Sequence, residues 1–334
     1  MSYNVTVEVL DRLSSRLHIN TILNLLINIP TMYLILFHST KAMGFYKYYL
    51  LYTVVGTVIM DLHQTVFYGT YVLLPSMVSC SSGYGRNFGM IWGSQVNYLI
   101  VHVNFSVVGI SLVSLAGYRY YALNGNSKWF DSKYSLSAFF IFGVVYPIPT
   151  VISVVLASFN QSKEELLDFV NKKYPEYSSL VQMGVCSSFK SYSLGLFYIL
   201  TSSTQMLIIE FFGLIFFFKI RDSLKSVKNS LSKATYNAQK QLVISMALQN
   251  VIPMFTLAIP IFIGMLIAIF DVKHSSFYSE IAVHIVTLHA PLNGLTMMMT
   301  IKPYKDALKN FIRPKPPPPR VQHIVVTNTV AIVQ

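Results

Sequence analysis

Seven long apolar segments, all of them free of Lys and Arg, constrain this chain more than any other feature of its sequence. A helix needs about 20 apolar residues to cross the hydrocarbon core of a bilayer. Backbone inside lipid must satisfy its own hydrogen bonds, which favours helices over irregular chain. The segments are residues 17–37, 48–74, 89–116, 135–157, 193–218, 241–270 and 280–301. This pattern predicts an all-α membrane protein built as a bundle of seven transmembrane helices.

The charged residues agree with this prediction because they are few and lie mostly between the apolar segments. Only 11% of the residues are charged and 53% are hydrophobic, whereas a soluble domain usually has about 25% charged residues. Most of the surface must therefore face membrane lipid. The excess of 25 basic over 13 acidic residues is spread over the short connections, so we expect no nucleic acid among the partners.

The distribution of Lys and Arg predicts which end of the bundle faces the cytoplasm. With the N-terminus outside, the inner connections and the C-terminal segment hold 17 of the 25 basic residues, as the positive-inside rule requires. Arg12 and Arg16 favour the opposite orientation, but the sum over all connections outweighs them. The expected division is an extracellular N-terminus over 1–16, a seven-helix domain over 17–301, an amphipathic membrane-surface helix over 302–312 and a cytoplasmic proline-rich tail over 313–334.

Both cysteines and two glycosylation sequons fall in segments that this orientation places outside. Cys80 and Cys186 are the only cysteines of the chain. Disulfides form and persist in an oxidising compartment, so we expect a disulfide between the two. The sequons begin at Asn4 and Asn160 and predict glycosylation there.

Polar residues and prolines inside the spans are candidates for a conformational switch, because polar groups in lipid are costly and tend to be functional. Asp61 lies near the middle of the second segment, and Asn28 and Asn293 are its expected partners. A protonated Asp61 that only hydrogen-bonds a neighbouring helix is the structural alternative. Pro253 and Pro260 lie seven residues apart in the sixth segment and predict either a hinge or a static kink.

Catalytic chemistry has little support in the sequence. No Ser, His and Asp set converges by sequence, and no phosphate-binding loop or His/Cys metal spacing occurs. The seventh segment contains no Lys that could hold retinal. We therefore expect a protein that is not an enzyme and that binds neither a cofactor nor a metal.

Four stretches resemble nematode serpentine chemoreceptors. Residues 39–51 resemble their first inner loop, and 249–253 followed by Pro260 resemble their sixth span; 289–294 (His-Ala-Pro-Leu-Asn-Gly) and 302–305 (Lys-Pro-Tyr-Lys) resemble the seventh span and its exit. The best match is class H, with class I a close second. The resemblance implies a G-protein-coupled receptor that detects an odorant or pheromone. It also implies a location in the plasma membrane, in the cilia of chemosensory neurons.

A ligand site is expected in the outer half of the bundle, between the third, fifth, sixth and seventh spans. The residues expected to line it, from helical turns counted along the third span and from position in the others, are Tyr98, His102, Phe105, Tyr198, Phe255 and His284. Ligand pockets are mostly apolar with a few polar groups, and this set carries no charge. We therefore expect a small, neutral, largely apolar ligand, with packing alone as the alternative role of each aromatic side chain.

The inner end of the bundle is expected to contact a heterotrimeric G protein through Arg119 and several basic or aromatic residues. Class H members usually have Glu-Asn-Arg there, whereas this chain has Gly117-Tyr118-Arg119, so an ion pair with an acidic neighbour in sequence is excluded. An arginine at this depth could instead extend to the membrane surface. The other expected contacts are Lys233, Lys302, Tyr304 and Lys305.

A membrane transporter and a ligand-gated channel are the alternatives from other functional classes. A transporter would favour paired inverted repeats and helices broken at mid-membrane, and the odd number of spans without a visible repeat argues against it. A channel of inverted topology would place the N-terminus inside and most basic residues outside, against the distribution of Lys and Arg.

Overall fold

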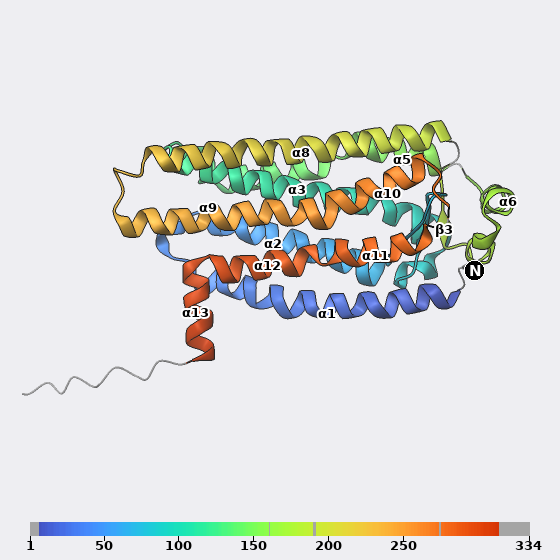
Figure 1. Ribbon diagram of the computed structural model, residues 1–334, viewed down its shortest axis with the longest axis horizontal. Coiled ribbons are helices and arrows are strands. Elements are labelled where there is room, and N and C mark those ends of the chain that lie inside the picture. Colours follow the sequence, from blue (N-terminus) through green and yellow to red (C-terminus); the bar gives the residue numbers. More distant parts are fainter. Residues whose placement is uncertain (1–6, 160, 190–191, 274, 314–334) are drawn as a thin grey trace, which may run out of the picture.

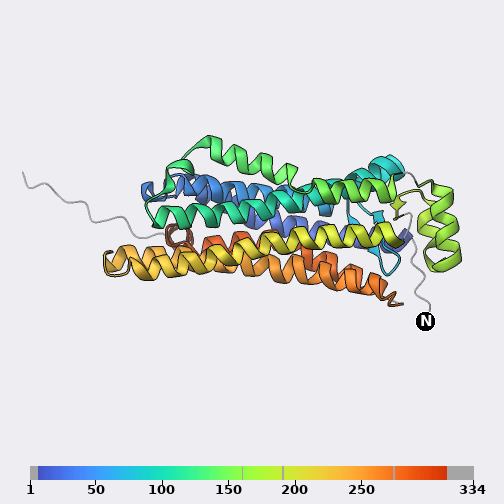
Figure 2. The same cartoon turned by 90° about the horizontal axis from the view of Figure 1, so that it is seen from above.

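The computed structural model describes residues 7–159, 161–189, 192–273 and 275–313. Within that part of the chain, seven helical segments are long and apolar enough to cross a membrane. They are Glu8–Phe37, Tyr46–Phe67, Met90–Leu123, Lys133–Ser158, Ser193–Ser226, Lys233–Ile269 and Phe277–Thr300. These segments lie side by side along the long axis of the molecule in both views (Figures 1 and 2). The predicted seven-helix bundle is confirmed, and the chain is a multi-pass membrane protein.

Several of the spans consist of more than one helix. Spans 1 to 3 are α1 (Val7–Phe37), α2 (Tyr46–Leu62) continued by the π-helical turn η2 (His63–Phe67), and α3 (Val96–Leu123) preceded by the π-helical turn η4 (Met90–Gln95). Spans 4 and 5 are α4 (Lys133–Val145) followed by α5 (Ile148–Ser158), and α8 (Tyr192–Ser226). Spans 6 and 7 are α9 (Lys233–Pro253), π-helical η7 (Met254–Ala258) and α10 (Ile259–Ile269), then α11 (Ser276–Thr287) and α12 (His289–Thr300).

Short elements occupy the connections between the spans and follow the last of them. The 3-10 turns η1 (Lys41–Met43), η3 (Tyr84–Phe88) and η5 (Ser127–Trp129) lie in the first three connections. Three strands are β1 (Thr70–Leu73), β2 (Val78–Ser81) and β3 (Cys186–Ser187). The connection between spans 4 and 5 holds α6 (Lys163–Lys173), η6 (Pro175–Tyr177) and α7 (Ser178–Gln182), and α13 (Lys302–Ile312) follows span 7.

The start of span 1 and the end of span 2 differ from the boundaries that hydropathy indicates. Helix α1 begins at Val7, ten residues before the first apolar segment, and its added turns bury side chains such as that of Leu10. Span 2 ends at Phe67 rather than at residue 74, because Gly69 adopts a φ of 58°, a left-handed conformation that favours glycine. A side chain at position 69 would also collide with Ser82. The remaining apolar residues of the second segment form strand β1 instead of helix.

Prolines interrupt spans 4 and 6, and side chains from neighbouring spans bind the backbone at both breaks. Pro147 separates α4 from α5, and the carbonyl of Tyr146 accepts a hydrogen bond from Nε2 of Gln205 at 2.6 Å. In span 6, the carbonyl of Pro260 accepts a hydrogen bond from the hydroxyl of Tyr278 at 2.8 Å. Such partners allow a helix to be broken inside a bilayer without leaving polar backbone exposed to lipid.

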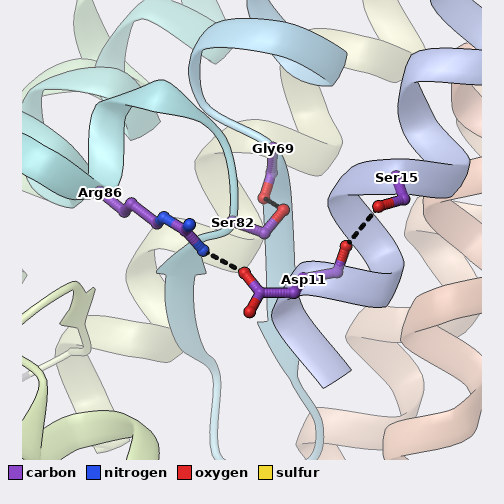
Figure 3. A network of polar contacts seen from close by, with 5 residues as sticks. All are labelled: Asp11, Ser15, Gly69, Ser82 and Arg86. Carbon is purple, nitrogen blue, oxygen red and sulfur yellow. Dashed lines mark hydrogen bonds and ion pairs between the residues drawn. The ribbon is translucent and has the colours of Figure 1, made fainter. Parts of the chain in front are cut away.

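A small antiparallel sheet closes one end of the bundle, which we call the disulfide end. Tyr71 of β1 pairs with Cys80 of β2, and Cys80 pairs with Cys186 of β3. The two cysteines form a disulfide, so the predicted bond is confirmed. After the hairpin, Arg86 pairs with Asp11 of α1 (Figure 3), which ties the hairpin to the first span.

Residues 163–182 form a helical cap, made of α6, η6 and α7, over the sheet at the disulfide end (Figure 1). Ser162 and Glu165 form a capping box that starts α6, in which each satisfies a backbone N–H that the first turn leaves free. Apolar side chains of the cap pack against the hairpin and the first turns of α1 in one buried cluster. The hydroxyl of Tyr177 donates to the carbonyl of Leu74 at 2.9 Å, so the cap and the hairpin form one unit.

Helix α13 marks the opposite end, which we call the α13 end, and it runs across the bundle axis (Figure 1). An aromatic cluster lies beneath it, and its members include Tyr46, Tyr49, Tyr118, Phe130 and Tyr304. The hydroxyl of Tyr304 lies 2.7 Å from Oγ of Ser39. This buried contact fixes the start of α13 to the end of α1.

Candidate functional site

A cavity of about 210 Å³ lies between spans 2 to 7 at the disulfide end. The hairpin forms part of its wall, because Thr70, Val72 and Leu74 face the cavity while Tyr71 and Leu73 pack into the cap cluster. Successive side chains of a strand point to opposite faces, so one face of the hairpin borders the cavity and the other supports the cap. Among the described residues, the lining includes no Asp, Glu, Lys or Arg.

Four of the six residues expected to bind ligand line this one cavity. Tyr98, His102 and Phe105 lie on one face of α3, and Tyr198 of α8 lies opposite. The hydroxyls of Tyr98 and Tyr198 are 2.6 Å apart. The His102 ring lies 5.1 Å from the ring of Tyr98 and 5.4 Å from that of Tyr198 between centroids. Tyr98, His102 and Tyr198 therefore form a packed aromatic wall, and Phe105 lines the cavity on the same face of α3.

The other two expected ligand residues, Phe255 and His284, do not line the cavity. Phe255 lies in η7 and is 59% exposed on the outside of the bundle, because a π-helical turn inserts an extra residue and rotates those beyond it. His284 faces α1, where its Nδ1 lies 3.3 Å from Nδ2 of Asn20. The lining residues of spans 6 and 7 that sequence reasoning missed include Ile261, Met265, Ser279 and Val283, and a spacing of four within each span could have indicated them.

The buried polar residues of spans 1, 2 and 7 form a second group, away from the cavity. Oδ2 of Asp61 accepts a hydrogen bond from Asn24 at 2.6 Å, and Oδ1 of Asn24 accepts one from Asn28 at 2.5 Å. The direct partner of Asp61 is thus Asn24, which the sequence reasoning missed although it lies one helical turn before Asn28. Asn293 is fully buried in α12, and within the described residues its side-chain amide has no hydrogen-bond partner.

Arg119 lies at the α13 end with only 6% of its surface exposed. Its guanidinium donates a hydrogen bond to Oε1 of Gln239 in α9 and lies 4.9 Å above the ring of Tyr46. This contact joins span 3 to span 6. A buried guanidinium held in this way does not extend to the membrane surface, which was the alternative role for Arg119.

The other residues expected to contact a G protein differ in their exposure. Lys233 begins α9, and Lys302 and Lys305 lie on α13; all three are exposed. Tyr304 is completely buried, because α13 packs this side chain against Ser39, and its contact with a partner stays a prediction. Phe311 and Ile312 are exposed at the end of the same helix.

Comparison with known families decides what kind of protein this bundle is. The family model of the serpentine type 7TM GPCR chemoreceptors Srh matches residues 10–314. The chain belongs to the Srh family. No curated protein was found to match it. The match confirms the resemblance to class H, and it places the chain in a family of chemosensory receptors rather than of enzymes.

Some of the residues expected to act in this Srh chain lie outside the described part. The sequons at Asn4 and Asn160 and residues 314–334 of the proline-rich tail are among them. In the described part, no group of three or more His, Cys, Asp or Glu side chains is arranged to hold a metal ion. Pro253 and Pro260 flank η7 in span 6, where the kink expected from the sequence contains a π-helical turn.

Proposed function

We propose that this Srh receptor lies in the plasma membrane with its N-terminus outside, binds a small, neutral, largely apolar odorant or pheromone in the cavity, and activates a heterotrimeric G protein at the α13 end. The observation that carries the proposal is the separation of two sites in one bundle. An uncharged cavity lies at the disulfide end, and a buried arginine joins spans 3 and 6 at the other end.

The character of the cavity supports a neutral ligand. An ionised ligand group in a wall without opposite charge would lose its hydration and gain no ion pair, which is strongly unfavourable. The lining is rich in apolar and aromatic side chains, such as those of Phe105, Met206 and Ile261. Pockets of this kind bind largely apolar small molecules and orient them with a few polar groups.

The proposed orientation rests on charge and redox chemistry together. The disulfide belongs in an oxidising environment, so the disulfide end faces outside. The α13 end then faces the cytoplasm and receives most of the basic residues, including exposed Lys233, Lys302 and Lys305. The cilia of chemosensory neurons remain the location that family membership suggests.

Coupling is proposed to require movement of span 6 away from span 3. The hydrogen bond from Arg119 to Gln239 holds the two spans together, and its release would free the guanidinium for a partner. The broken geometry of span 6 around η7 supports a hinge at Pro253 and Pro260, and the group around Asp61 and Asn293 would sense the same movement.

A receptor assay with a cavity variant tests the proposal. The full chain is expressed with a calcium or cAMP reporter and screened with neutral volatile compounds. Replacing Tyr98, His102 and Phe105 by Ala removes one wall of the cavity. We expect the concentration that gives half-maximal response to rise by more than about tenfold, because buried aromatic contacts dominate binding energy. Phe255→Ala, which changes an aromatic residue outside the cavity, is the matched control, and an unchanged dose response in the triple variant would refute the site.

A further inference from the structure

The hydrogen-bonding groups that line the cavity are distributed unevenly between its two sides. On the side of spans 4 to 6, they are already bound within the protein. Tyr146 donates to the carbonyl of Gln205 at 2.9 Å, and the Gln205 side chain binds Tyr146 and Thr150. Tyr278 of span 7 is bound in the same way, because its hydroxyl donates to the carbonyl of Pro260 in span 6 at 2.8 Å. These groups fix the breaks in the helices and have their hydrogens engaged.

On the other side, five polar groups of lining residues are buried and have no hydrogen-bond partner within the described residues. They are Nε2 of Gln64, Oγ1 of Thr70, Nε2 of His102, Oγ of Ser106 and Oγ of Ser279. We call these residues the polar wall. They come from η2, β1, α3 and α11, and two of them, His102 and Ser106, lie one turn apart on α3. A buried polar group without a partner destabilises a protein unless something binds it.

The chemistry of these five groups favours one kind of partner atom. The amide nitrogen of Gln64 can only donate a hydrogen bond, and hydroxyl groups can donate one. A neutral imidazole carries its hydrogen on one of its two nitrogens, so His102 can also donate. An oxygen atom that accepts hydrogen bonds therefore suits every member of the polar wall. An ammonium group, which offers only hydrogens and has no acceptor, does not suit Gln64.

We propose that the ligand is a neutral aliphatic carbonyl compound, such as a ketone, whose oxygen accepts hydrogen bonds from the polar wall. Its hydrocarbon part lies against the apolar residues of spans 4 to 6, which include Pro147, Met206, Ile209, Ile261 and Met265. This inference rests on the proposed function in one respect, that the cavity is the ligand site. It adds the functional group and the direction in which the ligand lies.

The test compares probes that differ at one position of one carbon chain. Octane, 2-octanone, octanoate and octylamine are titrated into the purified full chain in lipid nanodiscs, and binding is followed by the rise in melting temperature with ligand concentration. We expect 2-octanone to bind about tenfold more tightly than octane. The ketone oxygen can accept one or two hydrogen bonds from the protein that octane cannot form. Octanoate and octylamine should bind more weakly than 2-octanone.

Variants of the polar wall then test whether these residues cause the preference for 2-octanone over octane. Gln64→Leu, Ser106→Ala and Ser279→Ala are combined in one chain. The preference for 2-octanone over octane should fall to less than about threefold. The ligand-free melting temperature should change little, because Nε2 of Gln64 and the two hydroxyls have no hydrogen-bond partner within the described residues. Ser202→Ala is the matched control: Ser202 also lines the cavity and is as buried as Ser106, but its hydroxyl already donates to Ile199 at 3.3 Å. It should keep the full preference.

Each other outcome overturns the inference. The polar wall does not bind a carbonyl oxygen if octane binds as tightly as 2-octanone, or if either octanoate or octylamine binds most tightly of the four. The same conclusion follows if the combined variant keeps the full preference for 2-octanone over octane. Binding of none of the probes would do the same. If the combined variant fails to fold, the order of the four probes on the natural chain still decides. The proposed receptor function is tested separately by G-protein nucleotide exchange, which needs no probe.

Discussion

Arg119 joins spans 3 and 6 although no acidic residue lies next to it in sequence. Its guanidinium uses one edge to bind Gln239 and one face to cover the ring of Tyr46. An ammonium group has no planar face and no fork of donors. The role of this residue therefore depends on its guanidinium shape as well as on its charge.

The change of Arg119 to Lys tests the coupling role proposed for its guanidinium. We expect Arg119→Lys to keep surface expression and ligand binding but to reduce G-protein activation by at least about tenfold, because lysine has neither the planar face nor the fork of donors of arginine. Ligand-stimulated nucleotide exchange on purified G protein measures this. Full activation by the variant would contradict the coupling role proposed for Arg119.

Removal of the partner of Arg119 should have the opposite effect on basal activity. In Gln239→Leu the hydrogen bond from Arg119 is lost at nearly constant volume. Hydrogen bonds to charged groups are worth about 1.5–3 kcal/mol, so the equilibrium between joined and separated spans should shift by about tenfold or more. Basal nucleotide exchange without ligand should rise accordingly. Lys240→Gln changes the exposed neighbour and should leave basal exchange unaltered; equal exchange in both variants would contradict the proposed contact.

Single residues were predictable from the sequence where helical periodicity alone places them. Tyr98, His102 and Phe105 follow the turns of the regular helix α3 and line the cavity as expected. Phe255 did not follow, because η7 changes the helical repeat in the middle of span 6, and composition does not reveal a π-helical turn. The partner of Asp61 depends on the relative height of spans 1 and 2, which tertiary packing decides.

At the scale of elements, the cap and the connection between spans 6 and 7 are joined through the partly exposed side chain of Asp271. The hydroxyl of Tyr174 in the cap donates to Oδ1 of Asp271 at 2.6 Å, and Nζ of Lys173 lies 3.4 Å from Oδ2. The hydrogen bond from Tyr174 lowers the pKa of Asp271, and burial together with that bond raises the pKa of Tyr174. The contact is therefore intact at neutral pH.

This contact predicts a pH-dependent cap. Because the folded-state pKa of Asp271 is depressed, the stability it contributes is present above its ordinary value of about 4 and is lost as pH falls through the folded pKa. Asp271→Asn should lower the amide-exchange protection of residues 163–182 at pH 7 by about twofold to fivefold. Asp168→Asn is the control, since Asp168 pairs only with Lys172 of the same helix among the described residues. Protection equally reduced in both variants, or unchanged in Asp271→Asn, would rule out a link between the two connections.

The boundaries of elements were predictable where the apolar residues of a segment are also helical. All seven spans and the helix over 302–312 occur where apolar runs and the Lys-Pro-Tyr-Lys exit indicate. Strand β1 was read as the end of span 2 because its residues are as apolar as those of a helix, and the left-handed conformation of Gly69 is not visible in composition. The start of α6 carries a Ser-x-x-Glu signal at Ser162 that could have indicated the cap.

At the scale of the whole molecule, the disulfide joins parts of the chain that lie on both sides of spans 3 and 4. Cys80 and Cys186 are 106 residues apart in sequence, and they connect the hairpin over the cavity to the chain that leads into span 5. Around them, the hairpin, the cap and the first turns of α1 share one apolar cluster. The cavity wall, the cap and the first span therefore depend on the same bond.

Loss of that bond should destabilise the disulfide end and the ligand site together. A disulfide that closes a loop of this length restricts the unfolded chain, and removal of such bonds costs about 2–5 kcal/mol. Cys80→Ser should lower surface expression, melting temperature and ligand affinity, because the hairpin wall loses its covalent link to β3. The double variant Cys80→Ser with Cys186→Ser is the control for the remaining thiol, and it should match the single variant if the bond is the only role of both cysteines. Thiols open to alkylation in the folded, unreduced natural chain, or a melting temperature unchanged by Cys80→Ser, would show that the disulfide end is held by its apolar cluster alone.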